Sequence, residues 1–355
     1  MIRNLAVFLR TTGRLALAGT VAALALASTG CPKTTNEFVA APIVPQATVN
    51  IDADAASLLP FGALAIANLD AKQLTNSTVG GDLAALGERM IPFAGQIDFQ
   101  IKRDLDHAYL GMYSFSGADV LAVLTGTFHP DKLEAAAGKG LNTPYGVVVV
   151  STYAGRKFYT VANYGFTMLT EHTALAGTEA AMRRALDRIA AGTVKREMAT
   201  WMGDWVTQPG YPVLVASDVT KQSFGKTVTG YIPWIQGVQY VRIRGRFNPD
   251  QSFGMSGALT YPDSAKAANA AQGLGGISQS FTMMAVLKII GIAPLVRNMK
   301  VNPAGNDVQF QTVIDEKQTR DLIRLITGWV GSGTPPSIPP PGTATPPAGG
   351  GGSTI

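Results

Sequence analysis

The sequence has one cysteine and three histidines, and this scarcity excludes several familiar kinds of catalytic site. The histidines are His107, His129 and His172, which form neither the HExxH pattern of zinc proteases nor any pair four residues apart. The GxSxG pattern of many serine hydrolases is also absent. The sequence therefore lacks the common signatures of hydrolytic enzymes and predicts no cofactor.

Charge of one sign is also scarce beyond the first thirty residues. The formal net charge is +5, but three of those charges are Arg3, Arg10 and Arg14, which precede every acidic residue. From Cys31 onward the chain has 26 basic and 24 acidic residues. Such a balance predicts no polyanionic partner and no nucleic acid. With 355 residues, 46% of them hydrophobic, the chain is long and apolar enough to bury a large core.

The first thirty residues have the layout of a secretory signal peptide. A basic region ends at Arg14, thirteen apolar residues follow at 15–27, and Ser28, Thr29 and Gly30 are small. The apolar run is too short to span a bilayer, which needs about 20 such residues. One cleavage site, after Ala25-Leu26-Ala27, would release a soluble protein that begins at Ser28. We therefore expect export from the cytoplasm.

A second cleavage pattern competes with the first. Ser28-Thr29-Gly30-Cys31 resembles the lipobox of bacterial lipoproteins, in which the cysteine receives a diacylglyceryl group before the chain is cut in front of it. An unpaired thiol is a liability in an oxidising compartment, and lipidation of Cys31 would remove it. The acyl chains of a lipidated cysteine suffice for stable membrane anchoring. The resemblance implies a protein held by lipid at the cell envelope, on the outer membrane or a periplasmic face.

Composition predicts five segments along the chain. Residues 1–30 are the signal peptide, and the Pro-containing residues 31–48 are a lipid-anchored tether. Residues 331–355 hold seven Pro, seven Gly and no charge, which is typical of a disordered tail. Two α+β lobes are expected between the tether and the tail, at 49–195 and 196–330.

Strand and helix patterns alternate between the tether and the tail. Runs rich in Val, Thr and aromatic residues predict strands, and TEAAMRRALDRIAAG predicts a helix between an N-cap at Thr178 and a stop at Gly192. A last helix after Asp315 places Leu322, Leu325, Ile326, Trp329 and Val330 on one side. The apolar segment 280–296 contains Lys288 and predicts a packed helix at the lobe interface. The predicted strands are residues 61–70, 119–128, 146–153, 156–163, 212–217, 238–247, 252–261 and 307–314.

Similar segments recur in the two halves of the chain. ALAIANLDAKQ (63–73) resembles VLVASDVTKQ (213–222), TGTFHPDKLEAA (125–136) resembles GALTYPDSAKAA (257–268), and a helix begins near Thr178 and again near Asp315. The order of the segments is the same in both halves. The sequence therefore predicts an α+β protein of two related lobes, each with a mixed or antiparallel sheet and packed helices, that arose by internal duplication.

Two short motifs have a functional and a structural interpretation. HPDK at 129–132 resembles the His-Pro-Asp loop of J-domain co-chaperones, but it follows an apolar strand pattern, so we interpret it as the start of a helix.

DLDH at 104–107 gathers Asp104, Asp106 and His107. On a strand the two aspartates would share a face and could hold a metal ion or act as an acid and base. The alternative is the polar face of an edge strand or turn.

Five aromatic residues lie close together between 153 and 166. They could line a groove for a lipid, glycan or peptide, or they could pair across strands. The leading functional hypothesis is a non-enzymatic binding or scaffolding module of the cell envelope, with an envelope protein or a small apolar ligand as its partner. The alternatives are a metal-assisted hydrolase and a secreted protein without an anchor. The five aromatic residues are Tyr153, Phe158, Tyr159, Tyr164 and Phe166.

Overall fold

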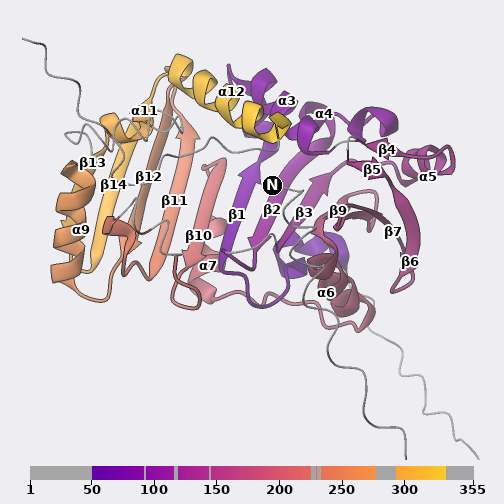
Figure 1. Ribbon diagram of the computed structural model, residues 1–355, viewed down its shortest axis with the longest axis horizontal. Helices are drawn as coiled ribbons and strands as arrows, with labels where there is room; N and C mark the ends of the chain where they lie inside the picture. Colours follow the sequence, from indigo (N-terminus) through magenta and orange to yellow (C-terminus); the bar gives the residue numbers. More distant parts are fainter. Residues whose placement is uncertain are drawn as a thin grey trace, which may run out of the picture. The chain divides into compact units, whose positions relative to one another are not determined.

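The computed structural model describes residues 50–91, 93–115, 119–143, 145–224, 229, 233–276 and 293–332. These residues belong to one compact unit of mixed α+β structure (Figure 1). Its main feature is an antiparallel sheet to which both halves of the chain contribute. Cys31, the tether and residues 333–355 lie outside the described residues, as do residues 280–292 of the predicted interface helix. The described helix α12 includes Gly331 and Ser332, the first two residues of the predicted tail.

Twelve strands form the sheet, in the order β13-β14-β12-β11-β10-β1-β2-β3-β9-β8-β7-β6. Every pair of neighbours is antiparallel. The strands are β1 (Ala65–Asp70), β2 (Leu105–Met112), β3 (Val120–Gly126), β6 (Val149–Tyr153), β7 (Arg156–Val161), β8 (Tyr164–Met168), β9 (Thr173–Thr178), β10 (Val213–Asp218), β11 (Tyr240–Phe247), β12 (Phe253–Thr260), β13 (Lys300–Ala304) and β14 (Asp307–Ile314). A separate small sheet pairs β4 (Asn142–Thr143) with β5 (Gly146–Val147).

The two halves of the chain meet at the pair β1 and β10. Ile66 lies opposite Ala216 and Asn68 lies opposite Leu214 in the antiparallel register. From this central pair the first half continues outward as β2, β3, β9 and β8, and the second half as β11, β12, β14 and β13. The two sides of the sheet therefore have corresponding strand orders.

Most predicted strands are present in the structure. Seven of the eight predicted runs contain one strand each, and the run 146–153 is divided between β5 and β6. The pattern of DVQFQTVI is clear in β14, where burial alternates so that Val308, Phe310 and Ile314 are buried and Gln309 and Gln311 are exposed. Alternating polarity thus fixes which face of each strand packs into the core.

Helices connect the strands and cover the sheet. Asp315 begins the last helix by accepting a hydrogen bond from the backbone N–H of Gln318 at 2.7 Å. The helices are α2 (Ala71–Thr75), α3 (Gly80–Met90), α4 (Ile101–Asp104), α5 (Pro130–Gly138), α6 (Glu179–Ala190), α7 (Thr200–Val206), α9 (Ser264–Gly276), α11 (Ala293–Arg297) and α12 (Glu316–Ser332). Short 3-10 turns are η1 (Ile51–Ala53), η2 (Ala55–Leu58), η3 (Ala94–Ile97) and η4 (Pro233–Ile235).

The predicted helix boundaries at Thr178 and HPDK are confirmed, with one difference in mechanism. Helix α6 begins after Thr178, but the Thr178 hydroxyl donates to Asp119 at 3.1 Å instead of capping the helix. The helix is followed by Gly192 with a φ of 67°. Helix α5 begins at Pro130, so the HPDK motif starts a helix.

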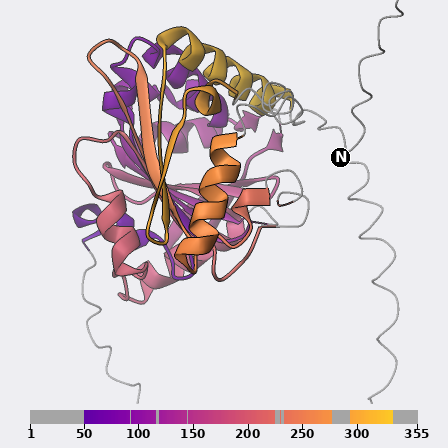
Figure 2. The same ribbon diagram turned by 90° about the vertical axis from the view of Figure 1, so that its left-hand side faces the viewer.

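The sheet has two faces, which we name after the helices that pack on them. The α6 face carries Ile66, Leu121 and Leu214, which pack with α6 and α7 in one core cluster. The α9 face carries Leu259 and Phe310, which pack with α9 and α11, and a third cluster covers the same face of the first half beneath η3, α4 and α5. Figure 2 shows α7 and α9 on opposite sides of the sheet. Among the described residues no helix is long and apolar enough to cross a membrane.

Candidate functional site

An apolar hollow lies on the α9 face near the end of the sheet formed by β7, β8 and β9. In Figure 1 these strands curve away from the plane of the central strands. The register places Tyr159 opposite Phe166, and Phe166 opposite Ala176, so the three side chains point to the same face. The hollow has a volume of about 430 Å³. It is large enough to hold a small organic molecule.

The interior of the hollow is aromatic and its side chains are buried. Phe93, Tyr159 and Phe166 are each more than 90% buried. The rings of Phe93 and Phe166 meet edge to face with 5.3 Å between their centres. Burial, aided by the negative charge of Glu134, raises the pKa of Tyr159, so its phenol stays neutral at physiological pH. Ala176 also lines the hollow, and its small side chain leaves space that a larger side chain would fill.

The rim of the hollow is aromatic but exposed. Tyr145 is 61% exposed and Tyr164 is 47% exposed, which is unusual for such large apolar side chains. Arg89, at the end of α3, is the one charged residue among the described residues that line the hollow. The site can therefore bury an apolar molecule and place one anionic or polar end beside Arg89. Its described lining offers no arrangement of acid, base and nucleophile for a reaction.

The structure brings together three of the five residues of the predicted aromatic groove. Tyr159, Tyr164 and Phe166 line the hollow, whereas Phe158 points to the α6 face, where it is fully buried. Tyr153 also belongs to the α6 face, and its hydroxyl donates to Asp187 at 3.1 Å. Neighbouring residues on a strand point to opposite faces, so Phe158 and Tyr159 on β7 cannot both line one groove.

Sequence reasoning did not identify the remaining wall of the hollow. Phe93 and Ile91 come from the segment after α3, and Val148 comes from the connection between β5 and β6. No local pattern links these residues to β8, because the contact depends on how distant segments pack. The exposed Tyr145 was the one visible signal, since an isolated aromatic residue beside Pro and Gly suggests a loop that contacts a ligand.

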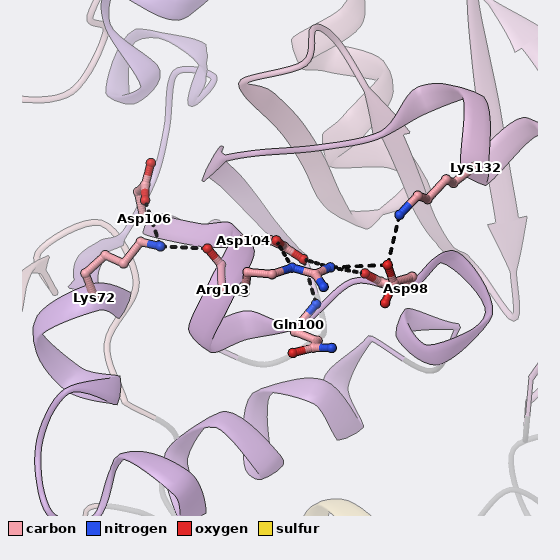
Figure 3. Close-up of polar contacts among 7 residues, drawn as sticks. All are labelled: Lys72, Asp98, Gln100, Arg103, Asp104, Asp106 and Lys132. Carbon is pink, nitrogen blue, oxygen red and sulfur yellow. Dashed lines mark hydrogen bonds and ion pairs between the residues drawn. The ribbon is translucent and has the colours of Figure 1, made fainter.

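The candidate metal residues do not form a common site. Asp104 is the last residue of α4, whereas Asp106 and His107 lie on β2, with an irregularity in the β2–β3 register between Leu105 and His107. Of the alternative, a polar face of an edge strand or a turn, β2 is not an edge strand, because it pairs with both β1 and β3, and Asp104 lies in the helical turn before it. Figure 3 shows the Asp104 carboxylate beside Arg103 and Asp106 beside Lys72. The two aspartates thus have different cationic partners.

The contacts of Asp104 explain its position. Arg103 donates to the two carboxylate oxygens at 2.6 and 2.8 Å, and the backbone N–H of Gln100 donates at 2.8 Å. Burial opposes ionisation, but these hydrogen bonds prevail and lower the pKa of Asp104. Asp98 extends the network through Lys132, at 2.9 Å. Within the described part of the chain, no three His, Cys, Asp or Glu side chains gather closely enough to hold a metal ion.

His107 differs from its two acidic neighbours. Its ring stacks on Tyr109 with 6.1 Å between the ring centres. Its Nδ1 atom is buried and has no hydrogen-bond partner among the described residues. The ring is therefore packed as a flat apolar group on β2.

Comparisons with known proteins give no family. No family model matches the chain, and no curated protein matches it. Among solved structures, crystal form III of TP0453 is 11% identical, with a TM-score of 0.49 over 78% of this chain and 98% of that chain. Crystal forms I and IV of TP0453 have TM-scores of 0.44 and 0.46, identities of 11% and 10%, and cover 78% and 77% of this chain and 97% and 96% of theirs.

Proposed function

We propose that this chain is a lipid-anchored, non-enzymatic binding protein of the bacterial cell envelope. Its hollow between β7, β8 and the end of α3 takes a small apolar ligand. The observation that carries the proposal is the combination of a buried aromatic interior with an exposed aromatic rim in one hollow of about 430 Å³. If these aromatic residues only formed part of a closed core, Tyr145 and Tyr164 would be expected to be buried rather than exposed at its edge.

The lipid anchor is supported by the sequence at Cys31. The signal layout and the lone cysteine after Gly30 give the chain a single lipidation site. Residues 31–48 provide a tether of prolines and small residues between the anchor and the fold. A protein held in this way would present its hollow close to a membrane, where apolar ligands are concentrated.

We also propose that the fold arose by internal duplication into two related halves. The corresponding strand orders on either side of the β1–β10 pair support this origin. Helix α5 follows β3 as α9 follows β12, and α6 follows β9 as α12 follows β14. The recurring sequence segments lie at corresponding points, since 63–73 contains β1 and 213–222 contains β10. The two halves share one sheet, so each half relies on the other for its innermost strand pairing.

Ligand binding is tested by filling the hollow. Ala176→Leu adds a branched side chain to the lining, and Ala190→Leu makes the same change at the exposed end of α6. The neutral fluorescent probe N-phenyl-1-naphthylamine should bind the natural protein saturably and Ala176→Leu about tenfold more weakly. Ala190→Leu should behave like the natural protein. Equal binding by all three proteins would refute the hollow as the binding site.

The natural ligand is sought in protein isolated from its own membrane. Native mass spectrometry of this protein should show a bound apolar compound, which the Ala176→Leu variant loses. A single ligand-free state in the natural protein would count against a small-molecule ligand. The anchor is tested separately by the intact mass of the mature chain. A chain that starts at Ser28 with an unmodified Cys31 would make the protein a secreted one without an anchor.

A further inference from the structure

A row of arginines crosses the α6 face in the second half of the sheet. Arg242, Arg244 and Arg246 alternate along β11, so their side chains point to the same face. Their partners on β12 are Ala258, Ser256 and Gly254. These small residues separate the arginines from the next row on β14. We name the depression over β12 the arginine trough.

The far wall of the arginine trough is polar. In the register of β12 with β14, Ser256 lies opposite Gln311, and Gln311 lies opposite Lys300 on β13. Two adjoining hollows of about 580 and 450 Å³ occupy this region. Both are lined by Arg244, Ser256, Gln311 and Lys300, so one cation comes from each wall. The trough is thus wide enough for a small polar ligand between the two walls.

The trough has more positive charge than negative charge. Asp307 is the one carboxylate among the described residues that line the two hollows, and it pairs with Arg242 at 2.7 Å. Within the described ranges, Arg244, Arg246 and Lys300 form no ion pair with a carboxylate. The near-neutral balance of the chain from Cys31 onward therefore hides a local excess of positive charge.

Aromatic rings hold the arginines in place. The guanidinium carbon of Arg244 lies 4.8 Å from the ring centre of Tyr211, and that of Arg246 lies 5.7 Å from it. The Nε atom of Arg244 also donates to the Ser256 hydroxyl at 3.1 Å. Stacked guanidinium groups lose less conformational entropy when they bind an oxyanion, because their orientation is already restricted.

Among the described residues, no helix covers the trough as α6 covers the first half of the same face. In the first half, α6 follows β9 and packs on the α6 face against β3, β8 and β9. In the second half, α12 follows β14 but packs against α3 (Figure 1). A sheet face that is left uncovered would normally carry mixed charges for solubility. On this face, Arg244, Arg246 and Lys300 have no carboxylate partner among the described residues. They surround the small residues Gly254, Ser256 and Ala258 of β12.

We propose that the arginine trough binds phosphate groups through Arg244, Arg246 and Lys300. A guanidinium fork matches the oxygens of a phosphate, and a lysine on the opposite wall adds a point charge. Residues two apart on a strand are separated by about 7 Å, so Arg244 and Arg246 can contact different oxygens or different phosphates of one ligand. The phosphate belongs either to a soluble polyphosphate or to a lipid headgroup.

The test uses the full-length chain in detergent solution and isothermal titration calorimetry. Sodium tripolyphosphate represents the soluble source, and dihexanoylphosphatidic acid represents the lipid headgroup, with dihexanoylglycerol as its phosphate-free control. The variant R244Q/R246Q should bind the preferred phosphate ligand at least about tenfold more weakly than the natural protein. The matched variant K266Q/K317Q loses the same charge from α9 and α12 and should bind normally.

The outcomes distinguish a soluble polyphosphate ligand, a lipid headgroup and the absence of phosphate binding. Binding of tripolyphosphate that depends on the two arginines assigns a soluble ligand, and binding of phosphatidic acid alone assigns a headgroup. Absence of binding to both, or equal weakening in the two double variants, overturns the proposal. If circular dichroism shows that R244Q/R246Q does not fold, the same titrations are made with the single variant Arg246→Gln. Arg246 is exposed, so this variant should fold. The trough and the apolar hollow lie on opposite faces of the sheet and in different halves of the chain. Either binding proposal can therefore be refuted while the other stands.

Discussion

The Nε atom of Arg103 lies 2.6 Å from Oδ1 of Asp104, and the two residues are neighbours in the chain. The aspartate side chain is 4% exposed, whereas the arginine side chain is 46% exposed. Arg103 therefore covers the carboxylate and shields it from water at the junction of α4 and β2. Because Gln100 also donates to this carboxylate, Asp104 closes the α4 turn upon itself. The pair stabilises the fold at this junction.

Replacing Asp104 by Asn should destabilise the protein in a pH-dependent way. The pKa of Asp104 is lowered in the folded state, so its contribution is present above the unfolded pKa of about 3.9 and is lost as the pH falls through the lower folded pKa. At pH 7 we expect Asp104→Asn to lower the unfolding free energy by about 2 kcal/mol. Below pH 3 the difference from the natural protein should shrink. Urea unfolding of the natural protein and the variant, at pH 7 and below pH 3, measures this difference in unfolding free energy.

Asp106→Asn provides the matched control. Asp106 is 51% exposed and its single ion pair, with Lys72, spans 3.5 Å. Exposed pairs of this kind contribute at most about 1 kcal/mol. A loss as large as that of Asp104→Asn, or a loss at Asp104 that does not depend on pH, would contradict the structural role assigned to the Arg103–Asp104 pair.

The single sheet predicts that the two halves unfold together. All four tryptophans, at 201, 205, 234 and 329, lie in the second half, whereas backbone circular dichroism reports both halves. Leu214→Ala removes a fully buried side chain of β10 beside the central β1–β10 pair, and should cost about 2 to 5 kcal/mol. The urea midpoint of unfolding should shift by the same amount whether it is followed by tryptophan fluorescence or by circular dichroism. Separate transitions for the two signals would show that the halves are independent.

The strands that sequence patterns predicted are those with strong β-branched or alternating character. β14 has strict alternation, β10 begins with Val-Leu-Val, and β11 contains Tyr, Val, Ile and Phe. The strands that the patterns missed are β2, β4, β8, β9 and β13. Of these, β8 (YGFTM) and β9 (TALAGT) contain Gly, Ala and Thr in a low-contrast pattern. Their structure depends on neighbours, since β9 is held between β3 and β8. Local sequence does not encode such pairing partners.

The site was predictable only within one hairpin. Tyr159 and Phe166 are close in sequence, and their cross-strand pairing follows from a two-residue turn between β7 and β8. Phe93 lies more than 60 residues upstream, so its contact with Phe166 needs the tertiary structure. The arginine row on β11 was visible as RIRGR, but four strands of the sheet determine that, among the described residues, Arg244 and Arg246 have no acidic partner. Composition averaged over the chain concealed this local charge.

The turn between β6 and β7 offers a stabilising substitution. Ala154 has a φ of 48° and Gly155 has a φ of 75°, as a two-residue type I′ hairpin requires. Alanine is strained in this region, whereas asparagine tolerates it. Ala154→Asn creates an Asn-Gly turn at an exposed position and should raise the unfolding free energy by about 0.5 to 1 kcal/mol. Thermal unfolding measures the gain, and Ala190→Asn at the exposed end of α6 should give none.

The outer strand β6 should cause self-association at high protein concentration. It pairs with β7 on one side, and Val149 and Val150 are 61% and 47% exposed. An apolar edge strand can add a strand from a second molecule, and a lysine on it blocks such pairing. Val149→Lys should therefore lower the associated fraction in sedimentation velocity at millimolar concentration. Val313→Lys adds the same charge at a valine 49% exposed on β14, an inner strand that pairs with β12 along its length and with β13 over residues 307–311, and should leave association unchanged. Equal effects of the two lysines would mean that charge alone, and not the β6 edge, controls association.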